Sequence, residues 1–390
     1  MITVNEARDL LRRYAIEQRT ELIDPRHGTG RFVAQPITVP HDHPLFDMSA
    51  VDGYAFAFGP VALDTWHVVA EVAAGDRLER ALRPGECARI FTGAMIPEGA
   101  DTVVMQEYVD RTGDRITHRD QALRMGGNVR RRGEQLKTGT TLFGPGHRLG
   151  PAAIGLLASV GVGRVEVVSL PRVAIVRTGG EFMDQGGLVP GRIFSSNEVM
   201  LSSALFQSGM GPPSLLCTAP DEDTPLREAL QEAIVNEVVI TTGGVSVGDH
   251  DRVRAVLEAM GAEVLFHGVR QKPGKPLLVA RLGGSWIFGA PGNPRAVLVC
   301  WHLYVLPFLR ALSGDADAWS TGSLPLAEPA HIKGDRTEFR AAMIRDGHVH
   351  LLADQGSHML SSLHQAHALA QLPSGIWPVG TPVEVHYLPT

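Results

Sequence analysis

Apolar residues near the amino terminus recur with the spacing of one helical face, at Val4, Ala7, Leu10, Leu11 and Tyr14. Thr3 and Glu6 precede this face with the spacing of a capping box, in which each side chain bonds the other's backbone N–H. The pattern therefore predicts an amphipathic helix at the start of the chain.

The pattern changes to short Val/Ile runs between about Phe32 and Thr141. Runs such as WHVVAEV and TVVMQEYV are interrupted by glycine and proline, which predicts a β-rich insertion. Residues 150–163, GPAAIGLLASVGVG, are typical of a short helix that ends at glycine. We expect this helix to pack beside the amino-terminal helix and to form one small domain from two separated pieces.

Strands and helices alternate from Pro171 onward. Apolar runs such as PRVAIVR, PSLLC and EVVITT are separated by helical patterns such as NEVMLSSALFQSG, and PGNP opens a last helix that runs towards Leu312. This alternation predicts a mostly parallel sheet covered on both faces, with functional loops at the carboxyl ends of its strands. After Ser313, short strands such as TEFRAAMI and PVEVHYL predict a small β-barrel or sandwich.

These patterns predict a multidomain α/β protein. We expect a small helical or mixed domain from residues 1–40 plus 141–168, a β-rich inserted domain at 41–140, a central doubly wound α/β domain at 169–314, and a carboxyl-terminal β-barrel-like domain at 315–390.

Composition restricts the partners and the compartment. The 42 acidic and 36 basic residues give a net charge of -6, which opposes general binding to nucleic acid or to acidic membranes. Cys87, Cys217 and Cys300 lack metal-ligand spacing, so we expect reduced and mostly buried thiols. The start of the chain lacks the apolar core of a secretory signal, and the apolar stretch AVLVCWHLYVLPFL is too short for a membrane span and contains His302. A buried helix and a cytoplasmic protein are expected.

Three strand-end loops could bind an anionic ligand. In TGGVSVGDHD, glycines let the backbone approach a phosphate, Ser246 donates a hydrogen bond, and Asp249 and Asp251 offer oxygen ligands to a divalent cation. In KPGKP, prolines hold two ammonium groups for an oxyanion. In PGNP, we expect an asparagine cap above the free N–H groups of a first helical turn. The candidate residues are Gly243, Gly244, Ser246, Gly248, Asp249, Asp251, Lys272, Lys275, Pro291, Gly292, Asn293 and Pro294.

Each loop also has a purely structural interpretation. A strand followed by a glycine turn and a helix is often only a turn, KPGKP could be a solvated hairpin, and PGNP alone is more often a simple helix start. Glu181, in TGGE, could bind a cation or an amine, although a lone loop glutamate is usually solvated.

Two further segments lie in the β-rich stretch. Asp52 beside Gly53, and Thr92 beside Gly93, suggest a tight turn with an acid at its tip. Arg131, in a run of three arginines, could hold phosphate bidentately, although such a run is more often a solvated patch.

Several longer motifs occur together in one order: DMSAVDGYA, IFTGAMIPEGADTVVMQE, GGNVRRRGE, TGGVSVGDHD, KPGKP, GAPGNP and DQGSH. From about Gly30 to the carboxyl end the chain resembles the molybdopterin molybdenumtransferase family, which is related to the E domain of gephyrin.

The resemblance implies a homodimer of four-domain subunits that takes adenylylated molybdopterin and molybdate, hydrolyses the adenylate and releases AMP. It also implies a cleft between the α/β domain of one subunit and the β-rich domain of the other. In it, Asp52, Glu181, Asp249 and Asp251 would hold Mg²⁺ or another divalent cation. Lys272 and Lys275 would attract molybdate and the pterin phosphate, while Thr92, Ser246 and the PGNP amides would donate hydrogen bonds. A molybdopterin adenylyltransferase and recipient molybdoenzymes would be the expected partners.

The chain departs from the family pattern at five positions. Met48 stands where the family usually has Asn, Gln135 where it has an acid, Gly180 and Ser195 where it has Asp, and Ala296 where it has Ser. These departures leave open a catalytically weak paralogue that binds or delivers the cofactor. A separate alternative is a nucleotide-processing enzyme, such as an adenylyltransferase or a CinA-like hydrolase, that shares only the α/β domain.

Overall fold

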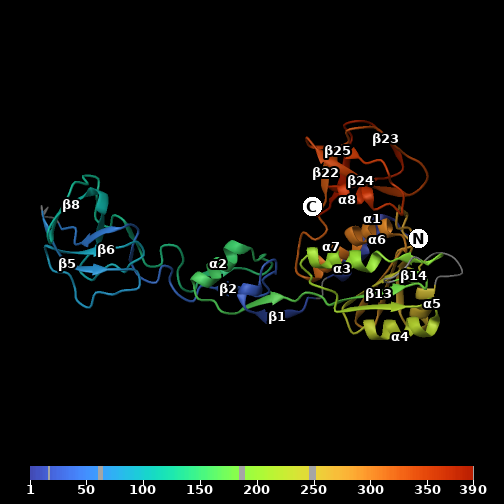
Figure 1. The fold of residues 1–390 in the computed structure, drawn as a ribbon, viewed down its shortest axis with the longest axis horizontal. Coiled ribbons are helices and arrows are strands. Elements are labelled where there is room, and N and C mark those ends of the chain that lie inside the picture. The colour runs from blue at the N-terminus through green and yellow to red at the C-terminus, as the bar shows by residue number, and fades with distance from the viewer. Residues whose placement is uncertain (16–17, 60–64, 184–188, 246–251, 390) are drawn as a thin grey trace. The chain divides into compact units, whose positions relative to one another are not determined.

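A computed structural model describes residues 1–15, 18–59, 65–183, 189–245 and 252–389. The chain forms two compact units (Figure 1). The larger unit comprises residues 1–21, 30–32 and 168–390, and the smaller unit comprises residues 22–29 and 33–167.

Six strands form the central sheet of the larger unit. Their order is β16 (Leu215–Ala219), β13 (Val173–Thr178), β17 (Val238–Thr242), β21 (Ser285–Ala290), β20 (Leu278–Leu282) and β18 (Glu263–His267). Strands β16, β13, β17 and β21 run parallel, whereas β20 is antiparallel to both of its neighbours. The prediction of a mostly parallel sheet is confirmed.

Helices cover both faces of this sheet (Figure 1). Side chains alternate along a strand, so Ile175 and Ile240 enter one apolar cluster, while Ala174 and Val239 enter another on the opposite face. Helices α3 (Asn197–Gln207) and α6 (Pro294–Cys300) pack in the first cluster. Helices α4 (Asp223–Ala233) and α5 (Arg252–Ala259) pack in the second. Burying one isoleucine of this kind contributes about 1.5–3 kcal/mol.

The apolar stretch AVLVCWHLYVLPFL forms a buried helix, as predicted. Helix α6, a π-helical segment (Trp301–Val305) and α7 (Leu306–Leu312) are contiguous. This helix is long and apolar enough to cross a membrane, but 67% of its most apolar window is buried inside the protein. Trp301, Tyr304 and Phe308 are among its fully buried side chains. The segment therefore serves as a core helix of the α/β layer.

The amino-terminal helix α1 (Val4–Tyr14) has the predicted capping box, with the Glu6 N–H donating to Thr3 Oγ1 at 3.2 Å. Its buried Val4, Ala7 and Leu11 belong to the core of the larger unit. Helix α2 (Pro151–Ser159) instead packs in a separate cluster of the smaller unit. The expectation that these two helices form one small domain is wrong, because each buries its apolar face in a different core.

The carboxyl-terminal region forms a β-barrel-like sheet. Its order is β19 (Gln271–Lys272), β24 (Thr337–Arg345), β26 (Ala368–Leu372), β28 (Pro382–Tyr387) and β22 (Gly322–Pro325), with β25 (His348–Leu351) also paired to β24. A bridge between Leu326, next to β22, and Val349 in β25 brings the two ends together. Side chains such as Ala342, Ala370 and Val385 fill the interior. The prediction of a barrel-like carboxyl-terminal fold is confirmed.

The smaller unit contains the predicted β-rich segment. Its six-stranded sheet has the order β7 (Thr102–Met105), β4 (Gly53–Phe56), β6 (Glu86–Ile90), β5 (Trp66–Val72), β9 (Arg115–His118) and β8 (Val109–Thr112). Apolar clusters cover its two faces, with Ala55 and Ile90 in one and Tyr54 and Cys87 in the other.

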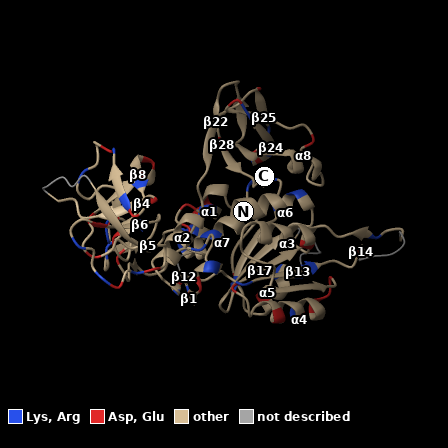
Figure 2. Cartoon of the chain, turned by 60° about the vertical axis from the view of Figure 1, so that its left-hand side comes forward, with Lys and Arg blue, Asp and Glu red and all other residues tan. Residues whose placement is uncertain are grey.

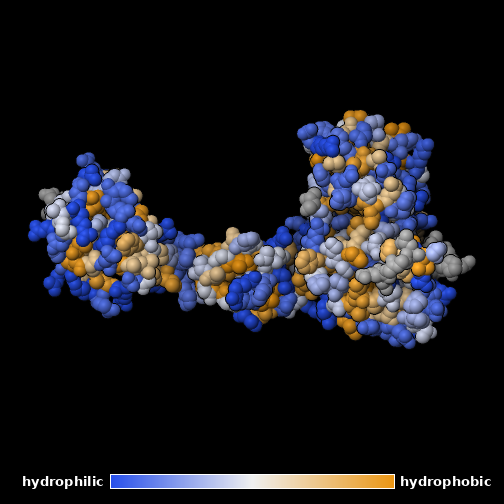
Figure 3. Space-filling view, in the orientation of Figure 1, coloured by the Kyte–Doolittle hydropathy of each residue, from blue (hydrophilic) through white to orange (hydrophobic). Residues whose placement is uncertain are grey.

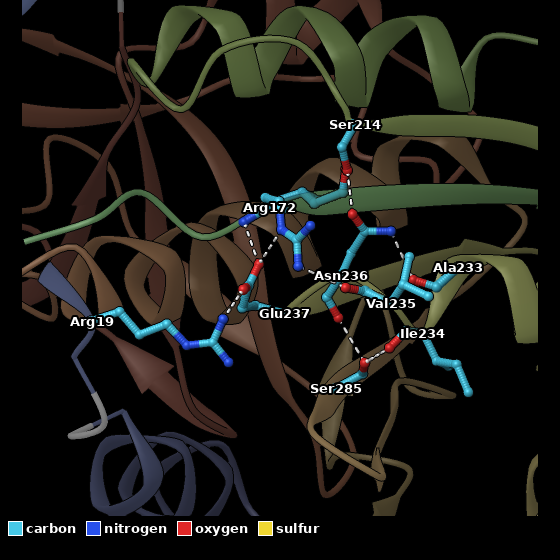
Figure 4. Close-up of polar contacts among 10 residues, drawn as sticks. Arg19, Arg172, Ser214, Ala233, Ile234, Val235, Asn236, Glu237 and Ser285 are labelled. Carbon is cyan, nitrogen blue, oxygen red and sulfur yellow. Dashed lines mark hydrogen bonds and ion pairs between the residues drawn. The ribbon is translucent and has the colours of Figure 1, made fainter. Parts of the chain in front are cut away.

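Polar contacts fix the amino-terminal ends of the central strands (Figure 4). Glu237 accepts hydrogen bonds from the Arg172 N–H at 2.9 Å and from Arg19 Nη1 at 2.5 Å. Ser214 Oγ donates to Asn236 Oδ1 at 2.6 Å, and Ser285 Oγ donates to Asn236 O at 2.6 Å. Arg19 and Arg172 flank the chain segment that builds most of the smaller unit, so Glu237 joins the two backbone segments that lead to and from it.

Candidate functional site

A cavity of about 640 Å³ lies at the carboxyl ends of β13, β17 and β21. It is the position at which parallel α/β sheets usually bind ligands. Four of the predicted loops contribute to it: TGGE, the start of TGGVSVGDHD, PGNP, and KPGKP through Pro276 alone. The lining residues are Thr178, Glu181, Phe182, Ile193, Phe194, Ser195, Ser196, Asn197, Thr242, Gly243, Gly244, Val245, Pro276, Pro291, Gly292, Asn293, Pro294 and His358.

Glycine is required where the loops after β13 and β17 meet. Gly243 has φ +92°, and a Cβ there would lie 2.8 Å from Thr178 Oγ1. Gly244 has φ +65°, and its Cβ would lie 2.8 Å from Val253 Cγ2. A Cβ on Gly292 would lie 3.9 Å from Gly243 Cα, so the TGG and PGNP turns are neighbours. The two turns present exposed backbone at one wall of the cavity.

The PGNP turn begins α6 differently from the prediction. Pro294 occupies the first helical position as expected, and Asn293 has the extended backbone of a cap residue. The Asn293 side chain makes no capping hydrogen bond, because its Nδ2 points to Ser357 Oγ at 3.4 Å. Asn293 therefore occupies the cap position as expected, but without the side-chain hydrogen bond of a cap. Asn197 Nδ2 donates to Gly292 O at 2.8 Å and links this turn to the start of α3.

A buried ion pair supports the opposite rim. Arg177 Nη1 donates to Glu198 Oε1 at 2.9 Å, and each side chain is 11% exposed. Ser195 Oγ donates to the other oxygen of Glu198, and the Arg177 guanidinium lies over the Phe182 ring at 5.1 Å. Sequence reasoning did not single out this pair, because a charged residue inside a strand or helix carries no local sign that it will be buried.

The KPGKP lysines do not line the cavity, although the neighbouring Pro276 does. Lys272 lies in β19 and its Nζ donates to Glu338 Oε1 at 3.0 Å, and Arg340 also pairs with Glu338. Burial raises the pKa of Glu338, but the hydrogen bonds from Lys272 and Arg340 outweigh it, so the pKa lies below the ordinary value. Lys275 is half-buried. The structure thus does not bring both ammonium groups into the cavity.

Asp52 and Thr92, for which the sequence suggested a tight turn with an acid at its tip, are hydrogen-bonded to each other in the smaller unit. The Thr92 N–H and Oγ1 both donate to Asp52 Oδ1, each at 2.8 Å. These hydrogen bonds, helped by the charge of Arg89, lower the pKa of Asp52. The carboxylate is therefore ionised and held in one orientation.

The arginine run is already paired with acids of its own unit. Arg131 Nη1 donates to Asp47 Oδ2 at 2.7 Å, and Arg132 Nε donates to Asp42 Oδ2 at 2.8 Å. Along the ribbon of the smaller unit, basic and acidic positions lie among one another (Figure 2). A phosphate would have to compete with Asp47 for Arg131, which favours the structural interpretation of this run.

Comparisons with known proteins cover nearly the whole chain. Residues 2–161 match the MoeA N-terminal region (domain I and II), residues 174–311 a probable molybdopterin binding domain, and residues 323–388 the MoeA C-terminal region (domain IV). A molybdopterin molybdenumtransferase from Nostoc sp. is 37% identical, over 96% of this chain and 89% of the relative. Another from Bacillus subtilis is 34% identical, over 96% and 90%. The chain belongs to the molybdopterin molybdenumtransferase family.

Solved structures show the same fold for this family member. Two crystal structures of a molybdopterin biosynthesis MoeA protein from Pyrococcus horikoshii, 29% and 28% identical, cover 100% of both chains with TM-scores of 0.81 and 0.78. The similarity includes both ends of the chain, which does not favour an enzyme that shares only the α/β domain. The relatives are named as transferases, which does not favour the weak paralogue either.

The departures from the family pattern have different surroundings. At Gly180 an added Cβ would meet nothing within 4 Å, so packing does not require glycine there. Ser195 instead bonds the buried Glu198. Ala296 is buried, with 2% of its surface exposed, whereas Gln135 is exposed to solvent. Met48 pairs with Arg130 in a short two-stranded sheet.

Part of the predicted cation site lies outside the described residues. The cation ligands concerned are Asp249 and Asp251, and Ser246 and Gly248 of the predicted phosphate-binding turn lie outside the described residues as well. Within the described ranges, no group of three or more His, Cys, Asp or Glu residues is placed to hold a metal ion. Glu181 is an exposed carboxylate at the cavity rim, and Asp52 is an ionised carboxylate of the smaller unit. Both supply the oxygen donors that Mg²⁺ prefers.

Proposed function

We propose that this protein inserts molybdenum into molybdopterin. It takes adenylylated molybdopterin and molybdate, hydrolyses the phosphoanhydride to release AMP, and leaves molybdenum on the pterin dithiolene. The cavity at the ends of β13, β17 and β21 carries the proposal, because its glycine turns bring backbone close to a ligand at the position where this sheet type binds nucleotides and phosphates.

The residues that line the cavity are better suited to binding the substrates than to forming covalent bonds with them. Ser195, Ser196 and Asn197 offer polar groups on one side, and the glycines of TGG and PGNP offer backbone on the other. Phe182 and Phe194 supply apolar surface for a pterin or an adenine. The protein would act mainly by holding the pyrophosphate and the incoming oxyanion in fixed relative positions.

A divalent cation, Mg²⁺ in our proposal, would be held by Glu181, Asp249 and Asp251 of one subunit together with Asp52 of the other subunit of the proposed dimer. When bound, it would neutralise charge on the phosphoanhydride. The two Thr92 hydrogen bonds would hold the Asp52 carboxylate in one orientation for this role. Lys272 and Lys275 would attract molybdate and the pterin phosphate, and Lys272 would have to exchange its Glu338 partner for the anion.

We also propose a cytoplasmic homodimer. Two apolar side chains of α3 are largely exposed, Val199 by 64% and Phe206 by 74%, and apolar residues lie among polar ones on the displayed face of the larger unit (Figure 3). A second subunit would remove such side chains from water. The three cysteines are free, which fits a reducing compartment. An adenylyltransferase that supplies the substrate and molybdoenzymes that receive the product are the proposed partners.

The decisive experiment supplies purified protein with adenylylated molybdopterin, Mg²⁺ and molybdate and follows AMP release and cofactor formation. We expect both products, and tight binding without AMP release would instead identify a carrier. Asp251→Asn should reduce adenylate hydrolysis more than substrate binding. Asp9→Asn, in an exposed pair with Arg12 on α1, is the matched control and should turn over normally.

A further inference from the structure

Arg295, the second residue of α6, is buried without a carboxylate partner. It is 0% exposed, and within the described part of the chain no acid forms an ion pair with it. Its Nε is buried and has no hydrogen-bond partner among the residues that the structure describes. Burying a cation in this way is costly, so the hydrogen bonds of the guanidinium must offset that cost.

All acceptors of the Arg295 guanidinium lie on one segment of the carboxyl-terminal region. Nη1 donates to Asp354 O at 2.9 Å and to Ser362 Oγ at 2.6 Å, and Nη2 donates to Gln355 Oε1. Asp354 and Gln355 lie near the start of the loop 352–360, between β25 and α8 (Ser361–Gln365), and Ser362 lies just after its end. One side chain of α6 therefore binds both ends of this loop.

Gln355 connects the same contact to the barrel. Its Oε1 accepts from the Ala341 N–H at 3.1 Å, and its Nε2 donates to Ala341 O at 3.1 Å. Arg295, Gln355 and Ala341 thus form a continuous polar link from the PGNP helix to strand β24.

The loop held in this way reaches the cavity. His358 lines it, and Ser357 Oγ accepts from Asn293 Nδ2 at 3.4 Å. We propose that Arg295 is a positioning residue, which holds loop 352–360 against the PGNP turn so that Ser357 and His358 complete the wall of the cavity. The role in holding the loop follows from the contacts alone, whereas its catalytic consequence rests on the proposed function.

Arg295→Met tests the proposal in a variant that should fold. In the variant, Asp354 O still accepts a hydrogen bond from the Ser362 hydroxyl, and Gln355 Oε1 still accepts one from the Ala341 N–H. Neither of these acceptors is therefore left unpaired. We expect amide hydrogen exchange in residues 352–360 to become about tenfold faster, with little change in the central sheet. Arg310→Met, an ion-paired arginine on the same long helix, is the control and should leave the loop protected. Unchanged loop exchange in Arg295→Met would overturn the proposal.

Chemical rescue separates a specific guanidinium contact from general loosening. In Arg295→Ala, added methylguanidinium should restore protection of the loop, because it can donate to the same acceptors. Methylammonium, which lacks the planar fork, should not. Equal rescue by both ions, or by neither, would contradict a guanidinium-specific link.

Kinetics test the catalytic consequence. Arg295→Met should raise the KM for adenylylated molybdopterin about tenfold, with a smaller change in kcat, because the cavity wall contributes to binding in the ground state and in the transition state alike. A fall in kcat without faster loop exchange would overturn positioning as the role of Arg295. If the wild-type protein released no AMP but the loop still loosened in the variant, the proposed function would fail while the role in holding the loop would stand.

Discussion

Thr92 fixes Asp52 through two hydrogen bonds to the same carboxylate oxygen, one from its backbone N–H and one from its hydroxyl, each 2.8 Å long. Folding lowers the pKa of Asp52 from the ordinary 3.8, and the bonds from Thr92 are the main cause. The carboxylate should be ionised throughout the neutral range.

Thr92→Val should remove the hydroxyl bond and keep the bond from the backbone N–H. We expect the pKa of Asp52 to rise towards 3.8, measured by NMR titration of the carboxyl carbon. AMP release at pH 7 should fall because the carboxylate loses its fixed orientation, even though it stays charged. Thr92→Ser is the control and should preserve both the pKa and the rate; a Val variant with full activity would exclude the orienting role.

Glu237→Gln should weaken the junction shown in Figure 4. We expect the free energy of unfolding at pH 7 to fall by about 1 kcal/mol, because Glu237 bonds both Arg172 and Arg19 and is only partly exposed. Urea unfolding measures this loss. Glu258→Gln, in an exposed pair with Arg254 on α5, should change stability by much less.

We also expect the stability contributed by Glu237 to depend on pH. Burial raises the pKa of Glu237. The hydrogen bonds from the backbone and side chain of Arg172 lower it by more than burial raises it, so the pKa lies below the ordinary 4.5. A lowered folded-state pKa gives stability that is present above pH 4.5 and is lost as the pH falls through the folded value. The difference between wild type and Glu237→Gln should therefore shrink on acidification below pH 4.5, and a constant difference would contradict this assignment.

Gly243→Ala should be more destabilising than Gly283→Ala. Both glycines have positive φ, +92° and +61°, so both variants should lose about 1 kcal/mol from backbone strain. Only at Gly243 does the new Cβ meet Thr178 Oγ1, at 2.8 Å, whereas nothing lies within 4 Å at Gly283. Urea unfolding of the two variants should differ by a further 1 kcal/mol or so, and equal losses would show that the turn accommodates a side chain.

Gly180→Asp and Ser195→Asp restore two acids of the family pattern, one next to the cavity-lining Glu181 and one in the cavity wall. Gly180 has open space around it, so its variant should fold with normal stability. Ser195→Asp should lose about 1 kcal/mol in the presence of EDTA, because the new carboxylate would lie beside the buried Glu198. Added Mg²⁺ should offset that loss if the rim binds cations, as unfolding with and without the ion would reveal. Ser195→Asn supplies the uncharged comparison.

The central fold follows from the sequence because burial of its strands is local and periodic. The run PRVAIVR becomes β13, and its alternate residues Ile175 and Ala174 divide between the two cores. The partner of an element is harder to predict than its type. The capping box predicts α1, but amphipathicity shows only that one face is buried, not that α7 and the α/β layer cover it.

The cavity was predictable in outline because strand-end loops of a parallel sheet converge on one edge. The supporting residues were not, since each depends on a distant segment. Arg295 meets acceptors about 60 residues further along, and Glu198 meets Arg177 on a neighbouring strand. Asn293 shows the same effect, because tertiary contact with Ser357 replaces the local cap that its sequence position favours.

Strand β19 also limits how chimeras of two family members can be built. It belongs to the stretch matched by the molybdopterin binding domain, yet it is hydrogen-bonded to β24 in the sheet of the carboxyl-terminal region. A chimera joined near residue 315 would pair a host β19 with a foreign β24 and would replace the Glu338 that Lys272 contacts. Exchange of the carboxyl-terminal region between family members therefore needs matched residues 271–275 to give a functional hybrid.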